Sequence, residues 1–139
     1  MTPEECDYHE LGYYTLAHGD PSFIHQHVVD AFAAQTSGDH DKPIKLTFSL
    51  VGLYLHVERG FSGRQVQRAH MALARRKRAW PTFAIPRDRG RITASVVLAA
   101  RAGPERDQMI HAWCACVWEA FRESRDVVVG LVEPLLKEN

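Results

Sequence analysis

Apolar side chains recur at helical spacing along most of the chain. In the segment 21–35, Ile24, Val28, Ala31 and Phe32 are three or four residues apart and would share one face of a helix. Comparable patterns, together with capping residues, mark several other segments. We expect helices over residues 3–17, 21–35, 62–78, 94–99, 104–125 and 127–137, the last of them interrupted near Pro134.

Capping residues support several of these boundaries. Thr2 before Pro3, and Asp20 before Pro21, each combine an N-cap side chain with proline at the first helical position. Ser62 would cap the helix that begins there. The prolines and glycine between 80 and 91 exclude a single helix across that range.

The segment 44–58 fits two patterns. Val51, Leu53, Leu55 and Val57 alternate with other residues, which is typical of a strand. The same segment has almost no polar side and is long for a strand. We interpret it as a central buried helix that ends at Arg59 and Gly60.

Together these elements predict an all-α fold, a single-domain bundle of about six helices over residues 1–139. A hydrophobic content of 45% and a charged content of 24% are ordinary for a soluble domain. The acidic first ten residues do not resemble a targeting signal, and no apolar run is long enough to span a bilayer. With three cysteines in the chain, an odd number, we expect a reduced, cytoplasmic protein without a membrane association.

Charge is unevenly distributed although the formal net charge is zero. Residues 1–41 contain five of the eight histidines and eight carboxylates, but no lysine or arginine. Residues 62–91 are basic, with a single acid, Asp88. The two segments could face each other in the fold, or could attract different partners.

The acidic segment suggests a metal site. Cys6 and His9 are three apart on one expected helix, and thiolate and imidazole are ligands that zinc prefers. In an antiparallel hairpin of the first two helices, His9 lies opposite Asp30, and His27 shares a face with Asp30. The candidate ligands are therefore Cys6, His9, His27 and Asp30, and His25 would join them only if the two helices crossed steeply. The alternative is structural: His25 hydrogen-bonded in the core and Asp30 paired with an arginine.

A second cysteine–histidine pair has the same spacing. His111 and Cys114 would complete a closed Cys2His2 set with Cys6 and His9 if their helices touched. The flanking Trp113 and Trp118 favour Cys114 as a core residue instead.

The basic segment carries the competing hypothesis. Arg64, Arg68, Arg75 and Arg76 could contact phosphates, and Trp80 could stack on a base. A basic stretch in a protein of zero net charge is more often a solvated face, so nucleic acid is the less favoured partner. No nucleophile motif and no phosphate-binding glycine loop is present, so the sequence does not decide whether the protein is an enzyme.

Four segments together resemble a bacterial family of unknown function, DUF5946. They are residues 6–11, 23–32, 50–60 and 113–118, and the resemblance covers about residues 6–122. Its most specific part is the stretch from His25 to Gln35, which is similar to the family pattern H-x3-V-D-A-Y-x2-Q, with Phe32 in place of the tyrosine. The pattern tends to place a cysteine about twenty residues earlier, where Cys6 stands.

The resemblance implies a small helical protein and adds weight to Cys6, His25 and Asp30. The family also tends to have a histidine in the third helix, where Ser49 stands here, with His56 one or two turns later. It implies no reaction.

Three hypotheses follow. The first is a helical protein that binds a divalent metal ion, zinc as the first guess, through its N-terminal hairpin. The second is a nucleic-acid or acidic-protein binding module that uses residues 62–91. The third is a non-catalytic homodimer that pairs the acidic hairpin of one copy with the basic helix of another.

Overall fold

The computed structural model describes residues 1–76 and 79–137 and is built from helices joined by loops, with no strand among those residues. The α-helices are α1 (Pro3–Ala17), α2 (His25–Gln35), α3 (Pro43–Arg59), α4 (Gly63–Ala74), α5 (Ala94–Ala99), α6 (Pro104–Ala120) and α7 (Arg125–Lys137). A short 3-10 helix, η1 (Arg122–Ser124), connects α6 to α7. The expected all-α bundle is therefore confirmed.

Four features of the helices differ from the expectation. α2 begins at His25 rather than at Pro21, because the Asp20 carboxylate accepts the backbone N–H of Ile24 at 3.2 Å and Phe23 adopts a φ of 60°. α4 ends at Ala74, and the expected end at Arg78 lies outside the described residues. The expected helix 104–125 is divided at Phe121, and α7 continues through Pro134 without the expected interruption.

The ambiguous segment is a helix. α3 begins with Pro43 at its first turn and ends at Gly60, whose φ of 69° is a left-handed conformation that favours glycine. All residues from Ser49 to Leu55 are buried, because α3 packs against α2, α4, α6 and α7. The strand-like alternation therefore arises from a helix that is apolar all round.

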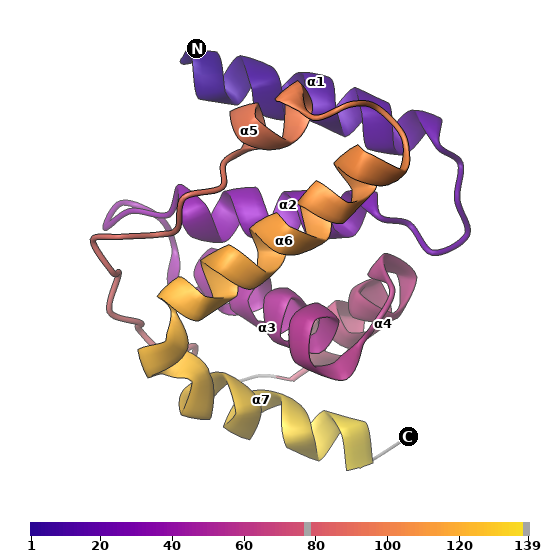
Figure 1. Ribbon diagram of the computed structural model, residues 1–139. Coiled ribbons are helices and arrows are strands. Elements are labelled where there is room, and N and C mark those ends of the chain that lie inside the picture. Colours follow the sequence, from indigo (N-terminus) through magenta and orange to yellow (C-terminus); the bar gives the residue numbers. More distant parts are fainter. Residues whose placement is uncertain (77–78, 138–139) are drawn as a thin grey trace.

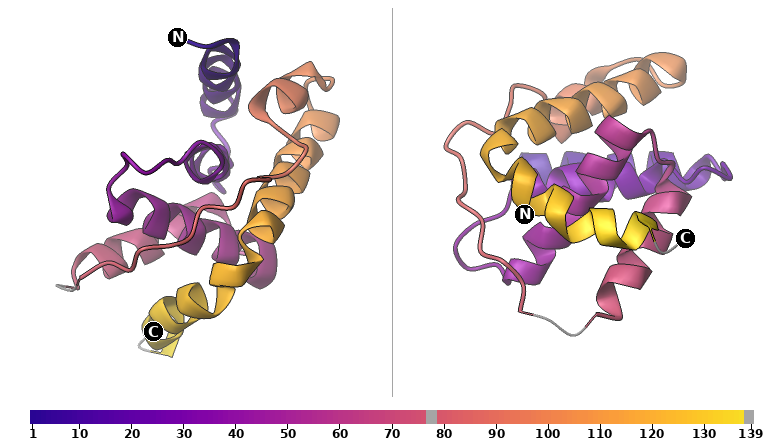
Figure 2. Two further views of the ribbon diagram at one scale, coloured as in Figure 1. Left: turned by 90° about the vertical axis from the view of Figure 1, so that its left-hand side faces the viewer. Right: turned by 90° about the horizontal axis from the view of Figure 1, so that it is seen from below.

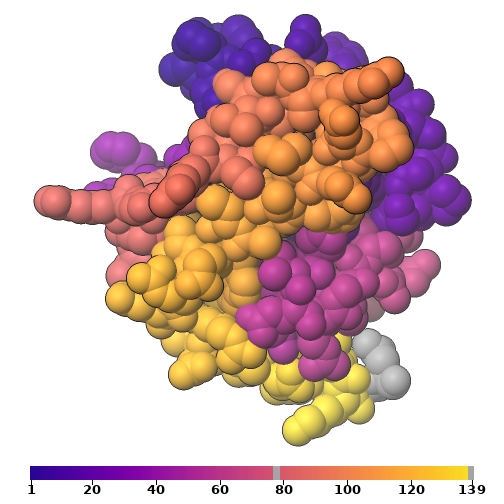
Figure 3. All heavy atoms as spheres, in the orientation of Figure 1, coloured from indigo at the N-terminus to yellow at the C-terminus, as the bar shows by residue number. Residues whose placement is uncertain are grey.

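α6 crosses the molecule diagonally over α2 and α3, with α1 and α5 beyond one end and α7 beyond the other (Figure 1). The two views of Figure 2 show the loop 79–93 running along one side of the bundle to join α4 to α5. On the face drawn in Figure 3, the atoms of α6 lie between those of α5 and those of α7. Of the helices described, none is long and apolar enough to cross a membrane.

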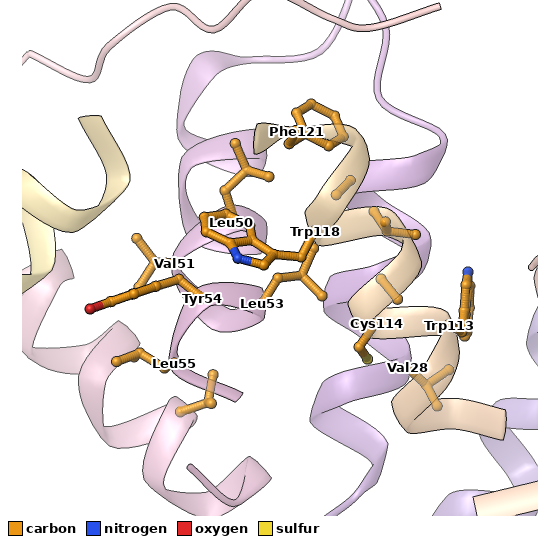
Figure 4. Packing of buried hydrophobic residues seen from close by; sticks show 14 of the residues in the cluster. Val28, Leu50, Val51, Leu53, Tyr54, Leu55, Trp113, Cys114, Trp118 and Phe121 are labelled. Atoms are coloured by element: carbon orange, nitrogen blue, oxygen red, sulfur yellow. The ribbon is translucent and has the colours of Figure 1, made fainter. Parts of the chain in front are cut away.

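The core lies where α2, α3 and α6 meet. Trp113 and Phe121 are the largest fully buried side chains, and Trp118 lies beside Leu50 and Leu53 of α3 (Figure 4). The buried Trp113 donates its indole N–H to Gln35 Oε1 at 2.9 Å, and the Gln35 amide donates to the backbone carbonyl of Ile92 at 2.7 Å. Gln35 therefore holds the loop before α5 against the core.

Candidate functional site: a histidine cluster

The two ligands predicted on the first helix face away from the core. Cys6 is exposed, and its thiol contacts the Met1 sulfur at 3.5 Å. His9 is also exposed, with its ring centroid 5.4 Å from that of Tyr8. Contact between α1 and α2 at this level is made by Tyr8, whose ring stacks on Phe32 at 3.8 Å.

His25 and Asp30 lie on α2 in two other environments. The His25 ring nitrogen Nδ1 lies 2.8 Å from the Thr15 hydroxyl, and the ring packs close to Gly12 of α1. The Asp30 carboxylate is buried against Gly52 of α3 and accepts the Gln26 side-chain N–H at 3.1 Å. His25 thus takes the structural role that the sequence offered as an alternative, whereas the hydrogen bond to Asp30 among the described residues comes from Gln26 and not from an arginine.

The hairpin residues do not share a metal-binding point in these side-chain positions. As the side chains stand in the part of the chain that the structure describes, no group of three or more His, Cys, Asp or Glu residues could hold a metal ion. Metal binding by Cys6, His9, His25, His27 and Asp30 stays a prediction, and their side chains would have to move to meet at one ion.

His27 instead meets two histidines that come from later helices. Its ring stacks on that of His56 of α3, with 3.5 Å between centroids and an interplanar angle of 20°. His56 Nε2 lies 2.8 Å from Nδ1 of His111 of α6. We call His27, His56 and His111 the histidine cluster.

Helix packing brings these residues together. α2 and α3 run antiparallel, because His27 lies beside His56 and Asp30 lies beside Gly52 one turn further along. α6 packs across both helices, and its His111 reaches the cluster from the solvent side. Solvent exposure therefore increases across the cluster, from His27, which is 3% exposed, through the half-buried His56 to the exposed His111.

The hydrogen bonds fix which ring nitrogens carry protons. His56 Nδ1 donates to the backbone carbonyl of Phe61 at 3.1 Å, since a carbonyl only accepts. A neutral His56 ring then has a lone pair on Nε2, which accepts the N–H of His111 Nδ1. A backbone carbonyl that orients a histidine through one nitrogen and leaves the other free to bind is the usual second-shell arrangement of metal ligands.

Burial keeps the inner rings neutral. Desolvation, followed by the proximity of His56 and His111, lowers the pKa of His27 to about 3. Desolvation is also the main cause of the lowered pKa of His56. Within the described ranges 1–76 and 79–137, His27 Nδ1 is buried without a hydrogen-bond partner, so the cluster contains a neutral imidazole with one unsatisfied buried nitrogen.

A cavity of about 480 Å³ lies beside the cluster. Counted over the described residues, its lining contains two carboxylates, Asp20 and Asp107, and a further imidazole, His18, but no lysine or arginine. Asp107 accepts the Tyr14 hydroxyl at 2.9 Å and lies 3.3 Å from His18 Nε2. Of the histidines and carboxylates of the N-terminal segment, His18, Asp20 and His27 line this cavity, and His56, Asp107 and His111 from later helices join them.

The basic residues lie elsewhere. Arg64 and Arg68 are exposed on α4, and Arg75 is exposed at its C-cap. The Arg64 guanidinium covers the Phe23 ring at 4.7 Å. Arg76 is partly buried, and Trp80 packs edge-on against Phe48 with 5.5 Å between centroids. Binding of nucleic acid by these residues, and the homodimer, stay predictions.

Sequence reasoning considered His56 and His111 but not their combination with His27. His56 was singled out only through the family resemblance, and His111 only with Cys114, which is buried in the core beside Val28 (Figure 4). Antiparallel pairing of α2 with α3 would have placed His56 opposite His27. The contact of α2 and α3 with α6, which is distant along the chain, has no comparable signal in the sequence.

Comparison with known proteins identifies a family and nothing further. A family model described as a family of unknown function (DUF5946) matches residues 4–122. No curated protein and no solved structure is similar enough to match.

Proposed function

The chain belongs to this family of unknown function, and on that premise we propose that it binds a divalent transition-metal ion, zinc first, at the histidine cluster. The observation that carries the proposal is the pair of imidazole nitrogens, His56 Nε2 and His111 Nδ1, which face each other at 2.8 Å. One proton lies between them, on His111 Nδ1. A metal ion can take its place when that proton moves to His111 Nε2, which leaves the Nδ1 lone pair free to bind.

The replacement needs only a small displacement. Two nitrogens bound to one tetrahedral zinc ion are about 3.3 Å apart, because each Zn–N bond is about 2.05 Å long. The two rings would therefore separate by roughly half an ångström. His111 is exposed on α6 and can turn without disturbing the core.

Further ligands can come from the same cavity. His27 and the carboxylates of Asp20 and Asp107 line it beside the two bridged rings. Imidazole with carboxylate is a donor set that suits zinc, nickel or copper better than calcium or magnesium. The hairpin set would need Cys6 and His9 to turn from solvent towards the buried Asp30, a much larger change.

Metal binding to matched histidine variants tests the proposal. We expect chelator-treated protein to take up about one Zn²⁺ per chain in competition with a chromophoric chelator. His111→Gln should weaken the affinity at least tenfold, whereas His9→Gln, which changes an exposed histidine of the hairpin set, should not change it.

Loss of affinity in His9→Gln and Cys6→Ser, with His111→Gln unaffected, would place the site in the hairpin instead. Failure of the unaltered protein to retain Zn²⁺, Co²⁺ or Ni²⁺ at micromolar concentration would refute metal binding at either place.

A further inference from the structure

A second cavity, of about 530 Å³, lies among α1, α2, α3 and α4 and has a buried carboxyl group in its lining. Its walls include Tyr8, Phe32 and Phe48, and its polar lining residues include Gln26, Asp30 and His70. None of these residues belongs to the histidine cluster or lines its cavity.

Asp30 is the unusual group of this cavity. It is 3% exposed. In the part of the chain that the structure describes, Oδ1 accepts only from the Gln26 amide, and the buried Oδ2 has no hydrogen-bond partner. Gly52 leaves room for it, because a Cβ at that position would come within 1.9 Å of Oδ2. A carboxylate in such a place is costly unless a cation pairs with it.

Of the described residues that line this cavity, one carries an ammonium group, and it does not provide that pair. Lys45 lines the same cavity, but its Nζ bonds to the Asp41 carboxylate at 3.3 Å, and the Lys45 side chain is 46% exposed. Among the described residues, the only hydrogen bond that reaches the Asp30 carboxylate comes from Gln26.

Aromatic rings line the same cavity as the carboxyl group. Tyr8 and Phe32 stack on each other at 3.8 Å, and Phe48 packs against Trp80 and His70. A desolvated carboxylate among aromatic rings is the combination that recognises organic ammonium groups, through charge pairing and cation–π attraction.

We propose that this cavity binds a compact organic ammonium compound, whose cationic group takes the place of the Gln26 amide at Asp30 and whose apolar part lies against Tyr8, Phe32 and Phe48. The proposal does not depend on metal binding at the histidine cluster.

Proton release should accompany binding. Burial raises the pKa of Asp30 well above its ordinary value and so favours the neutral acid in the empty cavity. The incoming ammonium keeps its own protons, the carboxyl O–H bond breaks, and the released proton passes to the buffer. The other titratable groups near Asp30 are Tyr8 of α1, Lys45 of α3, His70 of α4 and the Cys114 thiol of α6.

Calorimetric titration with benzylammonium at pH 7, with a chelator present, tests this proposal on the full chain. We expect saturable binding in the millimolar range or tighter, with about one proton released, as found from two buffers of different ionisation enthalpy. Benzyl alcohol, the neutral analogue, should bind at least tenfold more weakly.

Variants locate the site. Asp30→Asn should weaken benzylammonium binding at least tenfold and abolish proton release, whereas Asp126→Asn, which changes a fully exposed carboxylate, should leave both unchanged. If Asp30→Asn does not fold, Tyr8→Leu provides the second test and should weaken binding several-fold.

No saturable binding, equal binding of the alcohol, or full binding to folded Asp30→Asn would each overturn the proposal.

Discussion

Gly52 shows how one residue without a side chain makes room for a buried carboxyl group. It lies inside α3, where glycine costs about 1 kcal/mol of helix stability relative to alanine. The Asp30 carboxylate occupies the space that a Cβ would fill. A glycine that is unfavourable for the helix is therefore needed to bury Asp30, whose burial is also unfavourable.

Gly52→Ala should lower the free energy of unfolding by about 1–3 kcal/mol, because the new methyl group overlaps Asp30 Oδ2. Gly130→Ala is the matched control: that glycine also lies in a helix, but nothing is within 4 Å of its Cβ position, so stability should rise by up to about 1 kcal/mol. Urea unfolding measures both. If Gly52→Ala left the free energy of unfolding unchanged, that result would contradict the contact. When Gly52→Ala is combined with Asp30→Ala, the two losses of stability should not be additive.

The lowered pKa of His27 predicts that the protein loses stability in acid. Its pKa is about 3 in the folded protein and near 6.5 when unfolded, so between these values the unfolded chain binds more protons. Above pH 6.5, protonation of His27 does not change the free energy of unfolding. As the pH falls below 6.5, the loss in the free energy of unfolding that it causes grows to about 2 kcal/mol at pH 5. Asp30, whose pKa is raised, acts in the opposite sense.

The difference between the unaltered protein and His27→Phe isolates this contribution, because Phe keeps an aromatic ring beside His56 and cannot be protonated. Urea unfolding at pH 7.5, 6 and 5 should show the stability of the variant rising by about 2 kcal/mol relative to the unaltered protein over that range. Parallel curves for the two proteins would contradict a buried neutral His27.

At the scale of elements, the end of α3 is joined to α6 and α7 through one carboxylate. Glu58 accepts the Trp118 indole N–H at 2.7 Å and a bidentate pair from Arg125, at 2.8 and 2.6 Å. The hydrogen bond from Arg125 is the main cause of the lowered pKa of Glu58. The Glu58 carboxylate therefore links three helices, α3, α6 and α7.

Glu58→Ala should lower the free energy of unfolding by about 1–3 kcal/mol, because it leaves the Trp118 N–H and the Arg125 guanidinium without their acceptor. Asp126→Asn, which removes only a 3.9 Å surface pair with Arg125, should change it by less than about 0.5 kcal/mol. Chemical unfolding at pH 7 compares them. Equal effects of the two substitutions would mean that the contact at Glu58 adds no stability.

At the scale of the whole molecule, α7 lies beyond the family match at residue 122 but packs against α3 and α4. Val128, Val132 and Leu135 of α7 are buried in the same core as the residues of α2 and α6. We therefore expect the chain to unfold as one unit, as the sequence predicted for a single domain.

Val132→Ala should cost about 1–3 kcal/mol and shift the transitions seen by far-ultraviolet circular dichroism and by tryptophan fluorescence equally. Val127→Ala, which truncates a half-exposed valine of the same helix, should have less than about 0.5 kcal/mol of effect. Separate transitions for the two signals would show that α7 unfolds independently.

The sequence by itself determined the helices and most of their ends. Helical spacing is a local property, and caps such as Thr2 and Ser62 act within one turn, so neither depends on the rest of the fold. Length decided the ambiguous segment 44–58 in favour of a helix, although its alternation resembled a strand. The break at Phe121 and the late start of α2 depended on side-chain hydrogen bonds and turn geometry that periodicity does not contain.

Only the tertiary structure decided which histidines meet. The hairpin argument used the sequence neighbours α1 and α2, because their short connection fixes their pairing. The actual neighbours of His27 are His56 and His111, which are 29 and 84 positions away along the chain. Side chains so far apart are brought together by the crossing of α2, α3 and α6, and that crossing follows from packing of the whole core rather than from any local pattern.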